Sequence, residues 1–333
     1  MKKIKLTGGV WSATPTPLNA DGRVDTSSVE RLVEHHVRMG VTGIMLAGTC
    51  GEGPWLKDAD RETLVRTAAG VAKGRLRIAV QVTDNSAGRT LHNAEQAAKW
   101  GAEIAVVAQP YFFLNATPDR QLSFHRDFAR GSALPVGFYD RGKNSPYLMP
   151  EPHLDELLNE PNIALVTDSS TMPAHRELFL AVRKRRPELI LLDGDEFDCA
   201  TNIAAGYDGL LLGGDIFNAG LAHRIIRAAR AGDLTEAKRL QERMNDLMLR
   251  VYGGPKIECW MSGLKELLVQ MKIFSTGTQL LNYPLTDTCR NQITEALSGT
   301  DDLGYRSDLL IDALGVSWQL MRHRWSRLPL RSP

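Results

Sequence analysis

Short runs of apolar residues alternate along this chain with longer segments in which apolar residues recur every three or four positions. The first pattern predicts buried strands, and the second predicts amphipathic helices. The predicted strands are Gly9–Ala13, Gly43–Ala47, Leu76–Val82, Glu103–Ala108, Leu134–Tyr139, Ile163–Thr167, Glu188–Leu192 and Gly209–Leu212. The predicted helices between and after them are Ser27–Met39, Lys57–Ala72, Ala87–Trp100, Pro118–Arg130, Pro150–Asn159, Pro173–Arg185, Asp198–Gly206 and Ala219–Ala231.

Several strand-like segments, such as "GIMLAG" and "EIAVVAQP", are almost continuously apolar. Such runs are typical of parallel strands that are buried on both faces. Strand–helix units repeated over about 230 residues fit an α/β fold, the (β/α)8 TIM barrel. An open, doubly wound sheet remains the alternative, because periodicity does not reveal whether a sheet closes on itself.

The chain after the last predicted strand reads as helical. We expect a barrel at residues 1–232, a C-terminal helical segment at 233–325 and a loosely held basic tail at 326–333. Within the segment the predicted helices are Leu234–Tyr252, Pro255–Phe274, Asp287–Ser298 and Asp308–Trp325.

Composition narrows the function classes. The chain has 333 residues and a formal net charge of +1, which argues against nucleic acid or an anionic membrane surface as partner. It has no apolar run of about 18 residues that would span a membrane. The basic N-terminus lacks the apolar core of a signal peptide, so we expect a cytoplasmic protein. Its four cysteines are far apart, which argues against a disulfide framework or structural zinc.

In a barrel of this type, chemistry takes place at the C-terminal ends of the strands. One such end carries "GTCGE", residues 48–52. Glycines on both sides of Thr49 and Cys50 let a backbone approach a ligand closely, and successive backbone N–H groups can cradle an anion. We therefore interpret Gly48, Thr49, Cys50 and Gly51 as a carboxylate-binding turn rather than a plain connection.

The strand ends also carry a resemblance. The segments "GVWSATPTPLNADGRVD", "GTCGEGPWL", "VVAQPYFF", "LPVGFYD" and "GYDGLLLGG" are similar to the dihydrodipicolinate synthase / N-acetylneuraminate lyase family of class I aldolases, in the family order, from about residue 5 to about residue 300. The family builds a (β/α)8 barrel followed by helices, in dimers or tetramers. Its members join pyruvate to an aldehyde, or reverse that step, through a Schiff base on a barrel lysine and without a cofactor.

The resemblance implies roles for individual residues. Tyr139 matches the tyrosine that relays protons as general acid and base, and Thr49 matches the turn that binds the carboxylate. Further ligand contacts are implied for Gly48, Cys50, Gly51, Lys143, Asn144, Gly194 and Leu211.

The pattern breaks at the lysine. The family's "KDSSG"-like stretch is "LVTDSSTM" here, so Thr167 occupies the position of the lysine. Threonine cannot form a Schiff base, and the usual covalent mechanism is therefore absent. Phe112 replaces a second relay tyrosine, and Asn144 aligns with an arginine that binds substrate carboxylate.

Other lysine, carboxylate, histidine and cysteine side chains could also take part in chemistry. Lys143 could replace the missing nucleophile only if its amine were desolvated, and we expect Lys256 and Lys265 to be surface charges. Carboxylate oxygens can bind a metal ion, and four carboxylates lie near the predicted strand ends: Glu52, Asp140, Asp168 and Asp195. No histidine accompanies them, and Asp168 should point away from the barrel axis, so the pattern does not favour a metal site. We expect no metal, a packing or surface role for His35, His36 and His125, and a small polar lining role for Cys50.

Three hypotheses remain open. The first is a keto-acid aldolase or lyase that works without the usual imine. The second is a non-catalytic sensor or partner subunit that binds a small carboxylate. The third is a hydratase or isomerase that uses Tyr139 and acidic residues. We also expect a homodimer or homotetramer in which the aromatics Tyr111, Phe112 and Phe113 are buried against a neighbouring chain.

Overall fold

The apolar runs form a closed barrel of parallel strands in the computed structural model, which describes residues 6–299. The strands are β1 (Gly9–Ala13), β2 (Gly43–Leu46), β3 (Arg77–Gln81), β4 (Ile104–Ala108), β5 (Val136–Asp140), β6 (Ile163–Asp168), β7 (Ile190–Asp193) and β8 (Gly209–Leu212). Each strand pairs with its neighbours in sequence, and β1 closes the ring against β8 from Gly9 opposite Gly209 onward. The barrel prediction is confirmed, and the open sheet is excluded.

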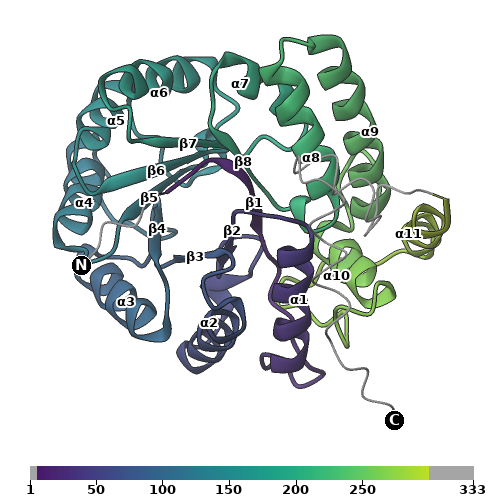
Figure 1. Ribbon diagram of the computed structural model, residues 1–333. Helices are drawn as coiled ribbons and strands as arrows, with labels where there is room; N and C mark the ends of the chain where they lie inside the picture. Colours follow the sequence, from purple (N-terminus) through teal and green to yellow (C-terminus); the bar gives the residue numbers. More distant parts are fainter. Residues whose placement is uncertain (1–5, 300–333) are drawn as a thin grey trace, which may run out of the picture.

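Helices surround the barrel on the outside (Figure 1). They are α1 (Thr26–Arg38), α2 (Asp58–Ala72), α3 (Ala87–Trp100), α4 (Pro118–Gly131), α5 (Glu151–Leu158), α6 (Pro173–Arg185), α7 (Cys199–Ala205) and α8 (Asp215–Arg230). Two short 3-10 turns, η1 (Gly53–Trp55) and η2 (Gly142–Asn144), follow β2 and β5. Because α8 begins at Asp215, it starts four residues before the predicted helix at 219, directly after the Gly213–Gly214 pair.

Local signals explain where several helices begin and end. Thr117 accepts a hydrogen bond from the Arg120 N–H at the start of α4, and Pro118 fills the first helical position. Gly101 ends α3 with φ +108°, a left-handed conformation that favours glycine. These boundaries were predicted because they depend on residues within one or two turns.

The C-terminal helices are α9 (Leu234–Tyr252), α10 (Trp260–Gln270) and α11 (Asp287–Gly299). They lie to one side of the barrel, next to α8 and α1 (Figure 1). A side-chain bond joins the two parts where Arg31 of α1 donates from Nε to the Ile273 carbonyl at 2.8 Å. The predicted helix at 308–325 and the tail at 326–333 lie outside the described residues.

One prediction about the C-terminal helices is wrong. Lys265, expected at the surface, is buried with no exposed area. Its position in α10 faces the barrel, and an amphipathic pattern does not reveal that a charged residue on the buried side has a partner there. His35, His36 and His125 are also buried, in keeping with the expected packing role.

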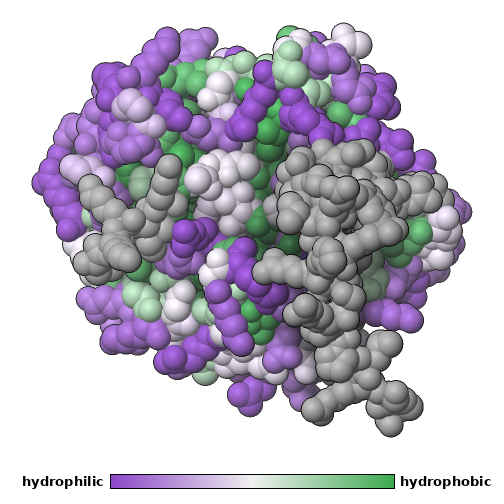
Figure 2. Space-filling view, in the orientation of Figure 1, coloured by the Kyte–Doolittle hydropathy of each residue, from purple (hydrophilic) through white to green (hydrophobic). Residues whose placement is uncertain are grey.

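Figure 2 shows one face of the molecule, with hydrophilic residues along its outer edge and apolar residues visible in the recess between them. Within residues 6–299, no helix has the length and apolar character needed to cross a bilayer.

Candidate functional site

A cavity of about 270 Å³ lies at the C-terminal ends of the strands. Its wall includes seven of the predicted site residues, Thr49, Cys50, Tyr139, Asn144, Thr167, Gly194 and Leu211. They come from the ends of five different strands, so only closure of the barrel brings them to one place. Because side chains from separate strand ends converge here, this cavity is the candidate site.

Three predicted residues lie off the cavity wall. Gly48 and Gly51 are turn residues. Packing requires glycine at Gly51, since an added Cβ would lie 2.8 Å from the Ala47 backbone nitrogen, whereas at Gly48 it would meet the flexible end of Met45. Lys143 lies in η2 with an exposed side chain and is not part of the wall. Activation of a lysine amine as a nucleophile needs burial away from water, which this exposed position does not provide.

Three adjacent strands end in an aspartate that performs the same structural task. Asp140, Asp168 and Asp193 lie opposite one another in the strand register. Each accepts a hydrogen bond at 2.9–3.0 Å from the backbone N–H two residues further on, that of Gly142, Ser170 and Asp195 respectively. Each also bonds a side chain from outside the barrel, His175, Tyr207 and Asn202 respectively. The three aspartates therefore shape the loops above β5, β6 and β7.

Since alternate side chains of a strand point to opposite faces, the residues that precede these aspartates point into the barrel. Tyr139 and Thr167 are such residues, and their Cα atoms are direct partners across β5 and β6. Both line the cavity. The expectation that Asp168 points away from the axis agrees with its 2.6 Å bond from the hydroxyl of Tyr207, which is not a lining residue.

Thr167 occupies a polar but unsatisfied position. Its side chain is 1% exposed, and its hydroxyl oxygen has no hydrogen-bond partner among the described residues. A buried hydroxyl without a partner costs free energy, so this atom is available to a bound molecule. No lysine is present among the described residues that line the cavity.

Tyr139 is the other polar group of the inner wall. Burial raises the pKa of its hydroxyl, and the nearby charge of Arg141 and the hydroxyls of Thr49 and Ser169 partly offset that rise. The hydroxyl is therefore protonated at neutral pH and can donate a hydrogen bond or a proton.

The turn after β2 contributes two residues to the cavity wall. Thr49 and Cys50 both line the wall, and among residues 6–299 neither of their N–H groups has a hydrogen-bond acceptor. Burial raises the pKa of the Cys50 thiol well above its usual value, with further contributions from the charges of Glu196 and Glu52. A neutral, buried thiol is a poor nucleophile, so this environment does not favour nucleophilic catalysis by Cys50.

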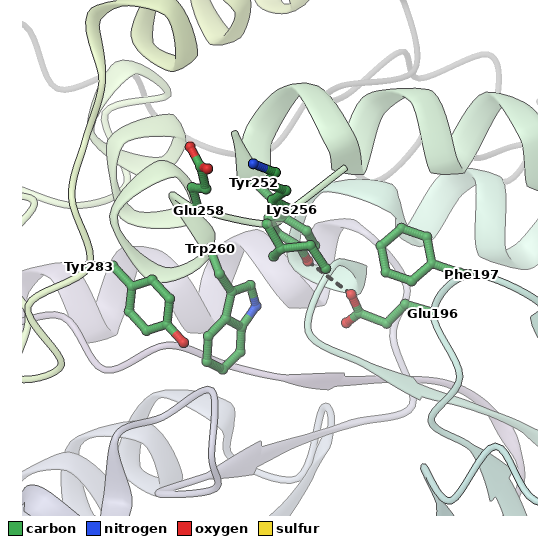
Figure 3. Close-up of a pocket in the computed structure, with 8 residues that line it drawn as sticks. Glu196, Phe197, Tyr252, Lys256, Glu258, Trp260 and Tyr283 are labelled. Atoms are coloured by element: carbon green, nitrogen blue, oxygen red, sulfur yellow. Dashed lines mark hydrogen bonds between the residues drawn. The ribbon is translucent and has the colours of Figure 1, made fainter. Parts of the chain in front are cut away.

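Glu196 completes the wall and was not predicted from the sequence. One carboxylate oxygen accepts a bond from the Gly214 N–H at 2.9 Å, and the other accepts a bond from the Tyr252 hydroxyl at 3.0 Å, drawn in Figure 3. Burial raises the pKa of Glu196. The residue follows Asp195 in the loop after β7, but Tyr252 ends α9, and no local pattern connects the two.

Comparison with known proteins decides the family. The family model described as "Dihydrodipicolinate synthetase family" matches residues 6–299, all of the described chain. The chain belongs to this family. It is 31% identical over 204 residues to 4-hydroxy-tetrahydrodipicolinate synthase of Xanthomonas campestris, a match that covers 61% of this chain and 66% of that protein. It is 30% identical over 243 residues to N-acetylneuraminate lyase of Rhizobium meliloti, covering 71% of this chain and 78% of that protein.

Solved structures agree on the fold of this family member. Dihydrodipicolinate synthase from Bacteroides thetaiotaomicron superposes with a TM-score of 0.81 at 24% identity, covering 89% of this chain and 100% of that one. YagE, a prophage protein from Escherichia coli solved in complex with pyruvate, has a TM-score of 0.77 at 21% identity and covers 88% of this chain and 98% of its own. The resemblance read from the strand-end motifs is therefore confirmed.

The polar groups that line the cavity limit the reactions that this protein can perform. Within residues 6–299 no group of three or more His, Cys, Asp and Glu side chains is arranged to hold a metal ion. The residues that line the cavity carry the hydroxyl groups of Tyr139 and Thr167, the backbone N–H groups of Thr49 and Cys50, and the carboxyl group of Glu196. Such a set can bind a carboxylate and a carbonyl and can exchange protons with them.

Proposed function

We propose that this protein binds a small keto acid, or another small carboxylate, at the mouth of the barrel without forming a Schiff base. The observation that carries the proposal is the pairing of two features on one wall. Thr49 and Cys50 line the cavity and have backbone N–H groups without an acceptor among residues 6–299, and the same wall carries Thr167, which the sequence motif aligns with the family's lysine. The first favours a carboxylate ligand, and the second leaves its carbonyl without an amine to attack it.

The experiment combines binding with trapping. Pyruvate is titrated into the protein by calorimetry, and a parallel sample is treated with pyruvate and borohydride and its intact mass is measured. We expect heat of binding and no mass increase, while a family member that retains the lysine gains mass under the same conditions. A mass increase mapped to any lysine of this chain would overturn the non-covalent part. No binding of pyruvate, lactate or other small carboxylates would overturn the ligand class.

A second candidate function, a hydratase or isomerase, is favoured by Glu196. Glu196 lines the same cavity as Tyr139, and burial raises the pKa of its carboxyl group, which favours the protonated form that can donate a proton. In this reaction class one group removes a proton next to the carbonyl and another protonates the oxygen, with the electron pair moving into the enol.

A hydratase or isomerase can be distinguished from a non-catalytic carboxylate-binding protein by exchange of the pyruvate methyl protons in deuterium oxide. Proton NMR follows this exchange. We expect Tyr139→Phe and Glu196→Gln each to slow the exchange by about 100-fold or more, the usual range for loss of a general acid or base. Glu258→Gln is the matched control, because Glu258 is not part of the cavity wall. Binding of pyruvate without any exchange would leave the non-catalytic sensor as the function.

A further inference from the structure

A second hollow adjoins the cavity on its outer side. It has a volume of about 450 Å³ and lies between the loop after β7, the end of α9 and the start of α10 (Figure 3). Three residues, Glu196, Phe197 and Trp260, line both spaces. The two spaces therefore meet at these three residues.

Aromatic rings dominate the hollow. Trp260 and Tyr283 pack edge to face, with ring centroids 5.7 Å apart and an interplanar angle of 79°. Phe197 is 36% exposed on the other side, and Figure 3 shows the Trp260 ring between Tyr283 and Glu196. Aromatic pairs prefer this T-shaped arrangement. A third ring, supplied by a ligand, could pack against Trp260 and Tyr283 in the same way.

The charged groups of the hollow are paired or directed elsewhere, and the Tyr283 hydroxyl lies beside the Trp260 ring (Figure 3). Both oxygens of Glu196 already accept a hydrogen bond, one from the Gly214 N–H and one from the Tyr252 hydroxyl. The charged ends of Lys256 and Glu258 point away from the Trp260 ring (Figure 3). The floor thus offers ring surface more readily than free hydrogen-bond acceptors, which suits an apolar substituent better than a chain of hydroxyl groups.

We infer that this hollow binds an aromatic ring carried by the same keto acid whose carboxylate lies against the turn at Thr49 and Cys50. The inference rests on the proposed function, since it places the acid in the cavity and the ring in the hollow. The cavity alone, at about 270 Å³, holds a compact keto acid, and the hollow supplies the space for the substituent. Trp260 lines both the cavity and the hollow, so its ring determines which substituents can reach from one to the other.

The test compares three ligands by calorimetry and by quenching of tryptophan fluorescence. They are pyruvate, 2-oxo-4-phenylbutanoate, which adds a phenyl ring, and N-acetylneuraminate, which adds a polyhydroxyl chain. We expect the phenyl keto acid to bind at least tenfold more tightly than pyruvate and N-acetylneuraminate to bind no more tightly than pyruvate. Absence of pyruvate binding counts against the proposed function. Binding of pyruvate without a gain from the phenyl ring, or a preference for N-acetylneuraminate, overturns this inference alone.

Substitutions in the hollow test whether the higher affinity for the phenyl keto acid comes from contacts with these aromatic rings. Tyr283→Ala and Trp260→Ala should each reduce the affinity ratio of phenyl keto acid to pyruvate by about tenfold. Phe112→Ala is the matched control, because Phe112 is an exposed aromatic residue that lines neither space, and it should keep the ratio of the unmodified protein. A ratio that is insensitive to both variants would place the ring outside the hollow. Circular dichroism of each variant establishes that it is folded.

Discussion

Lys265 and Glu52 form an ion pair in which neither side chain is exposed to solvent. Lys265 also donates from Nζ to the Thr278 carbonyl at 2.7 Å, and Glu52 accepts a bond from the Leu280 N–H. Glu52 belongs to the turn that presents Thr49 and Cys50 to the cavity, and it adopts a left-handed backbone conformation with φ +55°. The C-terminal helical segment therefore holds the cavity-lining turn in place through one buried pair of charges.

Loss of one partner of this pair should be costly. Lys265→Met leaves a buried, unpaired carboxylate, and we expect the free energy of unfolding to fall by about 3–5 kcal/mol. Combining it with Glu52→Gln removes the charge while keeping an oxygen for the Leu280 N–H, and should recover much of the loss. Urea denaturation measures each value. Arg66→Met is the control, since it breaks an exposed ion pair with Glu62 and should have little effect. Equal effects of Lys265→Met and Arg66→Met would contradict the assigned importance of the buried pair.

Restoring an amine at position 167 should restore trapping. In Thr167→Lys the new side chain lies on the cavity wall, and partial desolvation lowers the pKa of its amine so that the neutral, nucleophilic form is available. We expect a mass increase after treatment with pyruvate and borohydride. Thr171→Lys is the matched control, because Thr171 lines the same cavity from an exposed position and its amine should stay protonated. A folded Thr167→Lys variant that binds pyruvate but is not trapped would show that the keto carbonyl does not face this position.

A buried histidine should make stability depend on acidity. His125 lies between the rings of Phe124 and Phe138, and burial lowers its pKa from 6.5 to about 3. Between these two values the unfolded chain binds a proton at this residue and the folded chain does not. Its contribution to stability is therefore fully present above about pH 6.5 and is lost as the pH falls toward 3.

Replacement of His125 by phenylalanine should remove this contribution. Relative to the unmodified protein, His125→Phe should reduce the pH dependence of the unfolding free energy by about 1.4 kcal/mol per pH unit between pH 4 and 6. Urea titrations at several pH values supply the two curves. Replacement of the exposed His92 by phenylalanine is the control and should leave the slope unchanged. Parallel curves for His125→Phe and the unmodified protein would contradict a neutral buried histidine.

An exposed aromatic patch predicts self-association. Phe112 is 62% exposed and Leu114 is 73% exposed in the loop after β4, and the Trp55 and Tyr111 rings lie nearby with centroids 6.4 Å apart. Large contiguous apolar patches mark interaction surfaces. We expect the full chain to elute as a dimer or tetramer and Phe112→Glu to shift it toward the monomer, because a charge would be buried in the interface. Leu234→Glu, which alters an exposed apolar residue in α9, should have no such effect. A monomeric unmodified protein would make the prediction wrong.

The sequence by itself determined the alternation of strands and helices and the positions of the strand ends, while closure of the sheet into a barrel came from the structure. The alternation and the strand ends depend on local periodicity, on short turn motifs and on spacing along one chain, and adjacent strands of a barrel are neighbours in sequence. It also indicated that Thr49, Tyr139 and Thr167 share one site, because parallel strands of a barrel all end at the same rim.

Only the tertiary structure decided which charged residues are buried and what they meet. Glu196 bonds Tyr252 of α9, and Lys265 of α10 reaches Glu52 in the turn after β2. A helical pattern tells which face is apolar but not whether a charge on that face has a partner from a distant element, and desolvation makes that partner decisive. The aromatic hollow beside the cavity arises for the same reason, since Phe197, Trp260 and Tyr283 come together only when the C-terminal helices pack against the barrel.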